Sequence, residues 1–252
     1  MEIKGIAVGF IDVPQEHTKD YNYWYDFDHW PENLALPEIC GARRYVATPD
    51  CKAVRDGSFG PLGEGRGTYF TSYLLNTDDL DQAGESWHEL GSALRKKKRF
   101  FRHGSVPYGG IYRLKKTLIS KHVPPVVNEA GPWLGHQGVL VVLSQVRDPS
   151  MREAVEEWFE TIHAPDVLDI PGMACGMRLW RYAPQNDEPE NGWAMNLYLL
   201  DGDPVEVKKE IDRRRPYWLE QGRMPSPGLA SDAQFLGVYR SVTPVRYDFE
   251  VE

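Results

Sequence analysis

The chain of 252 residues contains one segment twice. The stretch "WYDFDHWPENLALP" (24–37) aligns without gaps with "WFETIHAPDVLDIP" (158–171), at a constant offset of 134 residues. The alignment pairs His29 with His163. Because a duplication of this size requires two similar folding units, it constrains the architecture more than any other feature of the sequence.

The same order of elements recurs around this shared segment. Runs rich in Val and Ile predict the strands, and polar stretches with a spaced apolar face predict the helices. In the first half we expect strands at 5–13, 41–48, 68–77 and 109–119, and helices at about 17–29 and 78–101. In the second half we expect strands at 138–146, 176–183, 192–201 and 236–245, and helices at about 149–163 and 203–221. Asp78 and Asp203 are the expected caps of the second helix of each half.

This β-α-β-β-α-β order is the ferredoxin-like arrangement, in which helices cover one face of a four-stranded sheet. The other face needs a partner. We therefore predict an α+β fold, a tandem duplication of a ferredoxin-like βαββαβ unit whose bare sheets meet to form an intramolecular pseudo-dimeric α/β barrel. The expected domains are the first repeat, 1–119, which we expect to be the active half, and the second repeat, 138–252. A linker at 120–137, with three prolines and two glycines, joins them.

Composition excludes several classes of protein. The chain is 41% hydrophobic and 26% charged, which is typical of a globular protein, and its net charge of -8 argues against nucleic acid as a partner. No apolar stretch is long enough to span a membrane, and the N-terminus shows no signal-peptide layout, so we expect a cytoplasmic protein without a membrane partner. The three cysteines form no CxxC pair and no pattern with histidines, so no metal is expected. The basic run at 95–103 is expected to complement the dipole at a helix end.

The repeated motif reads Trp-aromatic-acid-x-x-His-x-Pro-acid-x-Leu-x-hydrophobic-Pro in the first half, with Arg44 and Arg178 each 15 residues beyond a histidine. It resembles the dimeric α/β-barrel superfamily and, within it, the EthD-like and antibiotic-biosynthesis-monooxygenase-like proteins. The resemblance covers nearly all of the chain outside the linker. It implies a cavity between each sheet and its helices. Its implication for activity is weak, because such barrels host cofactor-free oxygenases, cyclases, isomerases, lyases, haem enzymes and proteins without known chemistry.

Each repeated histidine has two interpretations. At the C-terminus of the first helix, an imidazolium can satisfy terminal carbonyls and is favoured by the helix dipole, which is a structural role. In the cavity that the resemblance implies, the imidazole projects toward the rim, and its ordinary pKa of about 6.5 suits proton transfer near neutral pH. No nucleophile elbow, phosphate loop or dinucleotide fingerprint competes with it, so no cofactor is expected.

The candidate residues follow from these interpretations. The expected catalytic residues are His29, Arg44, Tyr112 and His163. The expected substrate-binding residues are Tyr25, Asp28, Trp30, Trp87, His103, Arg178, Trp180 and Tyr239, with His88 as a weaker candidate. The arginines suit a substrate carboxylate, enolate or phenolate, but salt bridges to Glu32 and Asp166 explain them equally well. The tyrosines of the last strands either donate to an oxyanion or pack against the helices.

The leading functional hypothesis is a cofactor-independent enzyme that acts on a small apolar carbonyl, lactone or phenolic compound. In it His29 transfers a proton, and Arg44 and Tyr112 stabilise the resulting anion, as in an isomerase, lyase, dehydratase or cyclase. The first alternative is a cofactor-free monooxygenase of an electron-rich aromatic compound or polyketide. Others are a haem-dependent dehydratase with a histidine as axial ligand, and a non-enzymatic small-molecule binding protein. Exposed edge strands favour a homodimer.

Overall fold

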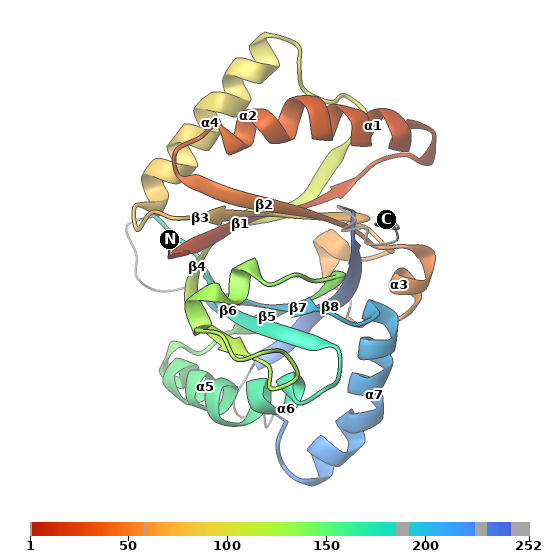
Figure 1. Ribbon diagram of the computed structural model, residues 1–252, viewed down its shortest axis with the longest axis vertical. Coiled ribbons are helices and arrows are strands. Elements are labelled where there is room, and N and C mark those ends of the chain that lie inside the picture. The colour runs from red at the N-terminus through yellow and green to blue at the C-terminus, as the bar shows by residue number, and fades with distance from the viewer. Residues whose placement is uncertain (1, 58, 185–191, 225–230, 243–252) are drawn as a thin grey trace, which may run out of the picture.

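The computed structural model describes residues 2–57, 59–184, 192–224 and 231–242. Eight strands in these residues form a closed barrel, in the order β1-β3-β2-β8-β5-β7-β6-β4 (Figure 1). The strands are β1 Gly5–Asp12, β2 Ile39–Val46, β3 Tyr69–Leu75, β4 Ser105–Ile119, β5 Gly138–Val146, β6 Met173–Arg181, β7 Trp193–Leu200 and β8 Ser231–Ser241.

The barrel consists of two ferredoxin-like sheets joined at their edges. The first repeat contributes the order β4-β1-β3-β2, and the second contributes the equivalent order β8-β5-β7-β6. The sheets join where β4 pairs with β6, with Arg113 opposite Trp180, and where β2 pairs with β8, with Val46 opposite Arg240. The predicted pseudo-dimeric barrel is therefore confirmed. Because the barrel is closed, it has no open strand edge, so the reason for expecting a homodimer no longer holds.

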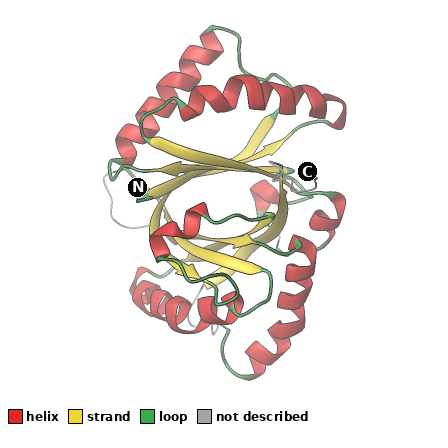
Figure 2. Ribbon diagram, in the orientation of Figure 1, coloured by secondary structure: helices red, strands yellow, loops and turns green. Residues whose placement is uncertain are grey.

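Helices cover the outer face of each sheet, and the barrel lies between the two helical layers (Figures 1 and 2). The first layer contains α1 Thr18–Trp24, the π-helical turn η2 Tyr25–His29, α2 Trp30–Leu34 and α4 Leu80–Lys96. The second contains α5 Arg152–Trp158, the π-helical turn η6 Phe159–His163, α6 Ala164–Leu168 and α7 Pro204–Glu220. The short helices are α3 Pro49–Ala53 and the 3₁₀ turns η1 Gln15–His17, η3 Gly60–Leu62, η4 Asn128–Trp133 and η5 Pro149–Met151.

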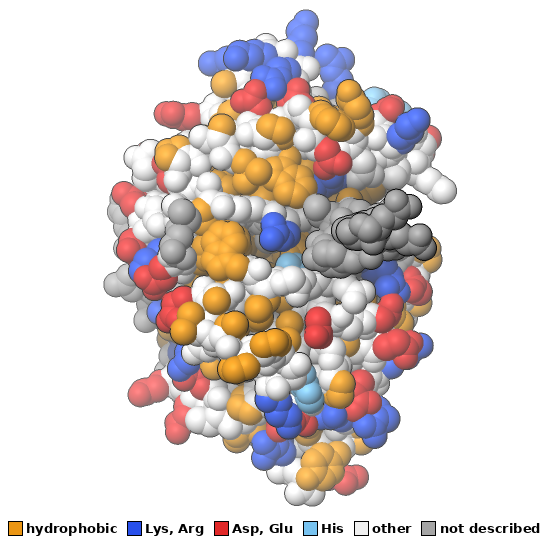
Figure 3. All heavy atoms as spheres, in the orientation of Figure 1, with side chains coloured by type: hydrophobic (Ala, Val, Ile, Leu, Met, Phe, Trp, Pro, Cys, Tyr) orange, Lys and Arg blue, Asp and Glu red, His pale blue; other side chains and the backbone are white. Residues whose placement is uncertain are grey.

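The helices begin close to the predicted residues, with one different cap, but α4 ends at Lys96, five residues before the predicted end. Asp203 accepts hydrogen bonds from the amides at the start of α7, as expected, but Asp79 caps α4 in place of Asp78. The basic run begins in the last turn of α4, which ends at Lys96, and its exposed side chains lie at the tip of that helix (Figure 3).

The repeated histidines lie within a continuous helix and do not end it, which corrects the expected boundaries. In both repeats the helix widens into a π turn that ends at the histidine, and the next amide donates five residues back, from Trp30 to the Tyr25 carbonyl and from Ala164 to the Phe159 carbonyl. A proline follows immediately. Since its ring clashes with the carbonyl four residues earlier in a regular helix, the wider turn allows the helix to continue.

Alternating strand residues face two different cores. Along β1, Ile6 and Phe10 belong to the core that fills the barrel, whereas Ala7 belongs to the layer between the first sheet and its helices. The barrel interior is therefore a packed core.

The linker closes one end of this barrel. The hydroxyl of Tyr45 shares a hydrogen bond of 2.8 Å with Nε2 of His136, whose Nδ1 lies 2.8 Å from the Leu134 carbonyl. Gly131 lies so close to β4 and β6 that a Cβ would come within 2.5 Å of Thr117, so only glycine fits there. In the part of the chain that the structure describes, no helix is long and apolar enough to cross a membrane.

Candidate active site

A hollow of about 270 Å³ lies between the outer face of the first sheet and the helix that carries His29. We call it the front chamber. Its residues come from β1, β3, the start of β4, the first helix, α4 and the segment that follows α4. They are Val8, Gly9, Ile11, Tyr21, Trp24, Tyr25, His29, Thr71, Tyr73, Trp87, Phe100, Phe101, Gly104 and Val106. Eight of these fourteen carry an aromatic or imidazole ring, so the chamber is suited to a flat, apolar ligand.

The His29 ring is held by aromatic neighbours. It stacks on Trp24, with ring centroids 4.6 Å apart, and lies edge-on to Tyr25 at 5.0 Å. Its Nδ1 is buried and has no hydrogen-bond partner among the described residues. Burial lowers the pKa of His29 to about 4, against a smaller opposing effect of the neighbouring Asp28 carboxylate. The imidazole is therefore neutral at physiological pH and able to accept a proton.

Three tyrosine hydroxyls belong to the same chamber. The Tyr25 and Tyr73 hydroxyls share a hydrogen bond of 2.5 Å, and the buried Tyr21 hydroxyl has no partner within the described residues. Burial raises the pKa of all three hydroxyls, so they keep their protons and act as hydrogen-bond donors.

Arg44 packs against the Tyr25 ring. Its side chain is 1% exposed and lies over the Tyr25 ring, with Cζ 4.1 Å from the ring centroid. The guanidinium donates to Asp26 and to Oδ1 of Asn22. The salt bridge to Glu32 that the sequence suggested is not formed, because Glu32 pairs with Arg99 at 2.6 Å. Arg44 is not among the residues that line the chamber, so it positions Tyr25.

The second repeat has an equivalent but smaller hollow, of about 100 Å³, next to His163. His163 stacks on Trp158 at 4.7 Å, and burial lowers its pKa to about 4. Arg178 lines this hollow and donates to Glu156 at 2.5 Å and to Asn196 at 2.9 Å. The suggested pair with Asp166 is again replaced, because Asp166 binds Arg223 at 2.6 Å.

The two hollows differ at the positions that matter for chemistry. Phe159 replaces Tyr25, so the Tyr198 hydroxyl, which corresponds to Tyr73, has no partner in the described part of the chain. Aliphatic residues line most of the remainder of this second hollow. They are Leu140, Val142, Val155, Val167, Ile211 and Leu236. The first repeat therefore carries the larger and more aromatic site.

Two of the remaining candidates belong to the first site or its border. Trp87 lines the front chamber, with its ring 4.8 Å from that of Tyr73. Trp30 contacts Tyr25 edge-on, and its buried Nε1 has no partner within the described segments.

Three further candidates are engaged elsewhere. Asp28 binds Arg99 at 3.0 Å. His103 stacks on His17 at 3.8 Å and does not line the chamber. The Trp180 indole donates to Glu156 at 3.1 Å, in the second repeat.

Tyr112 and Tyr239 lie on the opposite side of the sheet from the histidines. Both are fully buried in the barrel core. Tyr112 shares a hydrogen bond of 2.7 Å with Tyr108, and Tyr239 donates to the carbonyl of Gly67 at 3.2 Å. The structure does not bring Tyr112 to His29, because even-numbered and odd-numbered positions of a strand face opposite sides of the sheet.

Sequence reasoning did not identify several residues of the chamber. Tyr21 lies one helical turn before Tyr25 and two before His29, so its helical spacing was an available signal. Thr71 and Tyr73 alternate along β3 in the same way. Phe100 and Phe101 follow α4 in an irregular segment, where no periodicity predicts the direction of a side chain.

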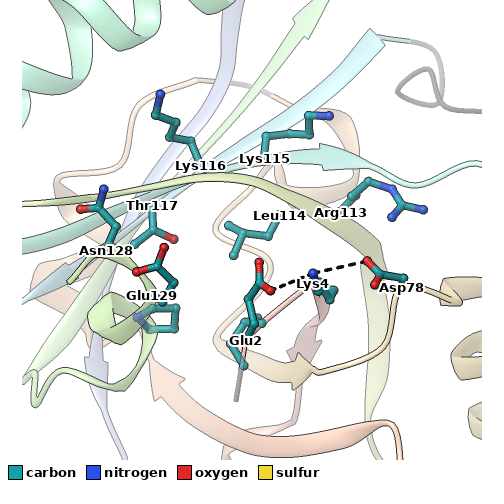
Figure 4. Close-up of a pocket in the computed structure, with 12 residues that line it drawn as sticks. Glu2, Lys4, Asp78, Arg113, Leu114, Lys115, Lys116, Thr117, Asn128 and Glu129 are labelled. Carbon is teal, nitrogen blue, oxygen red and sulfur yellow. Dashed lines mark ion pairs between the residues drawn. The ribbon is translucent and has the colours of Figure 1, made fainter.

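A larger groove of about 410 Å³ lies elsewhere, between the first strand, β4 and the linker. Figure 4 shows charged side chains around it, with Lys4 between Glu2 at 2.9 Å and Asp78 at 3.7 Å. Among the described residues that line it there is no histidine or cysteine, the side chains that most often transfer protons or act as nucleophiles near neutral pH.

The hollow next to His163, about 100 Å³, lies well below the roughly 300–1,000 Å³ of small-molecule sites and does not fit a haem. By itself, the front chamber of about 270 Å³ lies at the lower end of that range and suits a smaller ligand. Within the described ranges, no group of three His, Cys, Asp or Glu side chains is placed to hold a metal ion.

Comparisons with known proteins bear on the fold. No protein-family model matches the chain. No curated protein matches it. Among solved structures, an anthrone oxidase-like protein superposes with a TM-score of 0.54 at 10% identity, over 96% of this chain and 91% of the other. A dye-decolorizing peroxidase from Bacteroides thetaiotaomicron superposes with a TM-score of 0.57 at 10% identity, over 96% and 94%. Likeness at this identity concerns the fold alone, a closed α/β barrel with both ferredoxin-like units in one polypeptide.

Proposed function

We propose that the front chamber binds a planar phenolic or aromatic carbonyl compound and that His29 removes a proton from it without a cofactor. The observation that carries this proposal is the buried Nδ1 of His29, which has no partner among the described residues and belongs to a side chain that lines an aromatic chamber. A neutral imidazole can take a proton from a bound substrate, and an anion formed beside it would raise its pKa from about 4 toward the range that suits a general base. The protein is thus an enzyme, and its first repeat is the active half.

The neighbouring hydroxyls complete the chemistry. When the imidazole takes the proton, negative charge develops on the substrate oxygen. The Tyr21 hydroxyl is free to donate to that oxygen, and the hydroxyl pair of Tyr25 and Tyr73 supplies a second donor. The anion in turn stabilises the newly formed imidazolium, which opposes the effect of burial on its pKa.

Two fates of the anion correspond to two reaction types. Return of the proton to another atom, or loss of a leaving group, gives an isomerase, lyase, dehydratase or cyclase, and this is the leading proposal. In the second candidate the anion reacts with dioxygen, so that a CH₂ group and O₂ become a C=O group and water. The anthrone oxidase-like structure and the aromatic lining of the chamber support this alternative.

Anthrone tests the common step, because its CH₂ protons are acidified by an adjacent aromatic carbonyl system. Under argon in D₂O, the protein should accelerate exchange of these protons, measured by NMR. His29→Gln should lower the rate at least 100-fold. The matched control His163→Gln in the second repeat should leave it unchanged. Normal exchange in His29→Gln would refute the proposal.

Oxygen then separates the two candidates. Uptake of one O₂ for each anthrone consumed, with water as co-product, indicates the oxygenase. Exchange without oxygen uptake indicates the lyase or isomerase type. Binding of anthrone without exchange would instead support a small-molecule carrier.

All three cysteines are free thiols, which supports the proposed cytoplasmic location.

A further inference from the structure

A second hollow lies on the other side of His29. We call this space the rear chamber. It measures about 300 Å³ and lies between α2 and α4. Its lining residues are His29, Asn33, Gly84, Trp87, His88, Leu90, Gly91, Leu94, Arg95, Phe100 and Ile111. Three of them, His29, Trp87 and Phe100, also line the front chamber, so the two spaces lie on either side of these side chains.

Two glycines on α4 keep the rear chamber open. Gly84 and Gly91 are seven residues apart, so both lie on the face of α4 that lines the chamber. A Cβ at Gly91 would have only the Arg95 guanidinium within 4 Å, at 3.8 Å, so nothing in the packing excludes a side chain. Each glycine inside a helix costs about 1 kcal/mol relative to alanine. The space therefore exists at the expense of helix stability.

A buried acceptor in the same chamber lacks a donor. Asn33 is fully buried, and its Nδ2 donates to the His29 carbonyl at 2.5 Å. Its Oδ1 has no hydrogen-bond partner among the residues that the structure describes. Such an unsatisfied buried oxygen costs about 1–3 kcal/mol. The equivalent position in the second repeat is Val167, so the acceptor is specific to the half that carries the proposed site.

We infer that the substrate extends past His29 into the rear chamber, where a hydroxyl or N–H group donates to Oδ1 of Asn33. This inference rests on the proposed function and names its substrate class. The substrate is an elongated polyphenol or related aromatic compound with hydrogen-bond donors at both ends. One ring occupies the front chamber, and the far donor satisfies the orphaned oxygen. The basic groups of His88 and Arg95 at the exposed rim favour substituents of negative or partly negative charge.

A pair of rod-shaped probes tests the far contact. 4-Phenylphenol has a hydroxyl at one end, and 4,4′-dihydroxybiphenyl has a second hydroxyl at the other. Isothermal titration with the full chain should give a Kd about tenfold lower for the diol. The Asn33→Leu variant should bind the two probes with equal Kd, because Leu offers no acceptor. Equal binding by the unmodified protein would overturn the inference.

A substitution that fills the rear chamber provides the second test. Gly91→Leu places a side chain in the rear chamber and also favours the helix, so loss of binding cannot be attributed to unfolding. It should weaken binding of the diol at least tenfold. The control Ala93→Leu adds similar bulk on an exposed part of α4 and should bind the diol normally. Normal binding of the diol by Gly91→Leu would also overturn the inference.

Failure of this inference is distinguishable from failure of the proposed function. If anthrone exchange depends on His29 but the biphenyl probes ignore Asn33 and Gly91, the front chamber is the site and the rear chamber is not part of it. If exchange is independent of His29, the proposed function fails, whatever the probes show.

Discussion

The hydroxyl oxygens of Tyr25 and Tyr73 lie 2.5 Å apart in the front chamber, whereas in the second repeat Phe159 stands at the position of Tyr25 and the Tyr198 hydroxyl has no partner in the described residues. The equivalent strand tyrosines of the two repeats therefore differ: the Tyr73 hydroxyl has a hydrogen-bond partner, and the Tyr198 hydroxyl has none among the described residues. The pair belongs to the half with the larger chamber, which links the hydrogen bond to function as well as to stability.

Tyr25→Phe converts the first repeat to the arrangement of the second. It should lower the free energy of unfolding by about 1–2 kcal/mol, because the Tyr73 hydroxyl then loses its partner. The double variant Tyr25→Phe/Tyr73→Phe should recover part of that loss. Urea denaturation provides the measurement. Tyr198→Phe serves as the control and should be neutral or stabilising, since its hydroxyl is already unsatisfied.

The buried imidazoles make the protein sensitive to acid. The pKa values of His29 and His163 are lowered to about 4 in the folded state, against about 6.5 when unfolded. The unfolded chain therefore binds more protons below pH 6.5, and stability should fall as pH decreases from 6.5 to 4. Each imidazole contributes at most about 1.4 kcal/mol per pH unit.

This acid sensitivity can be assigned by substitution. In thermal unfolding between pH 4 and 8, His163→Gln should show a shallower decrease of Tm below pH 6.5 than the unmodified protein. His122→Gln is the control, because that imidazole is exposed at the surface, where its Nε2 lies 2.9 Å from the Asp169 carbonyl. An unchanged slope in His163→Gln would show that the lowered pKa is not the source of the acid sensitivity.

Loss of the carboxylate partner should destabilise the protein more at Arg178 than at Arg44. Arg178 donates three hydrogen bonds to Glu156 and one to Asn196, and only 3% of its side chain is exposed. Glu156→Leu should lower the free energy of unfolding by about 3 kcal/mol, because it leaves a buried guanidinium without its carboxylate. Asp26→Leu should cost less, since Asp26 is 46% exposed and Arg44 keeps Asn22. Chemical denaturation of the two variants checks the order.

Sequence reasoning predicted the architecture because duplication and hydrophobic periodicity are local signals. The repeat at 24–37 and 158–171 was enough to predict two ferredoxin-like units, and all eight strands occur near the expected positions. The helix boundary at His29 was wrong, because Pro31 resembles a stop signal while the π turn that accommodates it leaves no compositional trace.

The composition of the site was harder to predict. Tyr112 was expected beside His29, but side chains of β4 alternate between the two faces, and the face cannot be assigned until the strand register is known. The partners of Arg44 and Arg178 were also missed. The sequence suggested Glu32 and Asp166, but the partners are Asp26 and Glu156, which lie on earlier turns of the same helices.

One ion-pair network between the repeats centres on Asp56. This aspartate binds the buried ammonium of Lys208 at 3.0 Å and the guanidinium of Arg215 at 2.9 Å, both on α7. Lys208 also has a second carboxylate, Asp212, at 2.6 Å. Asp56→Asn should lower the free energy of unfolding by about 2 kcal/mol, less than a fully buried pair, because the aspartate is 40% exposed. Urea denaturation measures the effect.

A matched aspartate separates the buried contact from a surface one. Asp50 also crosses between the repeats, to Arg240 at 2.8 Å, but is 54% exposed. Asp50→Asn should cost less than about 1 kcal/mol, since solvent and salt screen an exposed pair. Because Arg215 also lines the hollow next to His163, Asp56→Asn should in addition enlarge access to that hollow, seen as faster hydrogen exchange of α7 amides. Equal stability losses in the two variants would show that Lys208 does not depend on Asp56 for its burial.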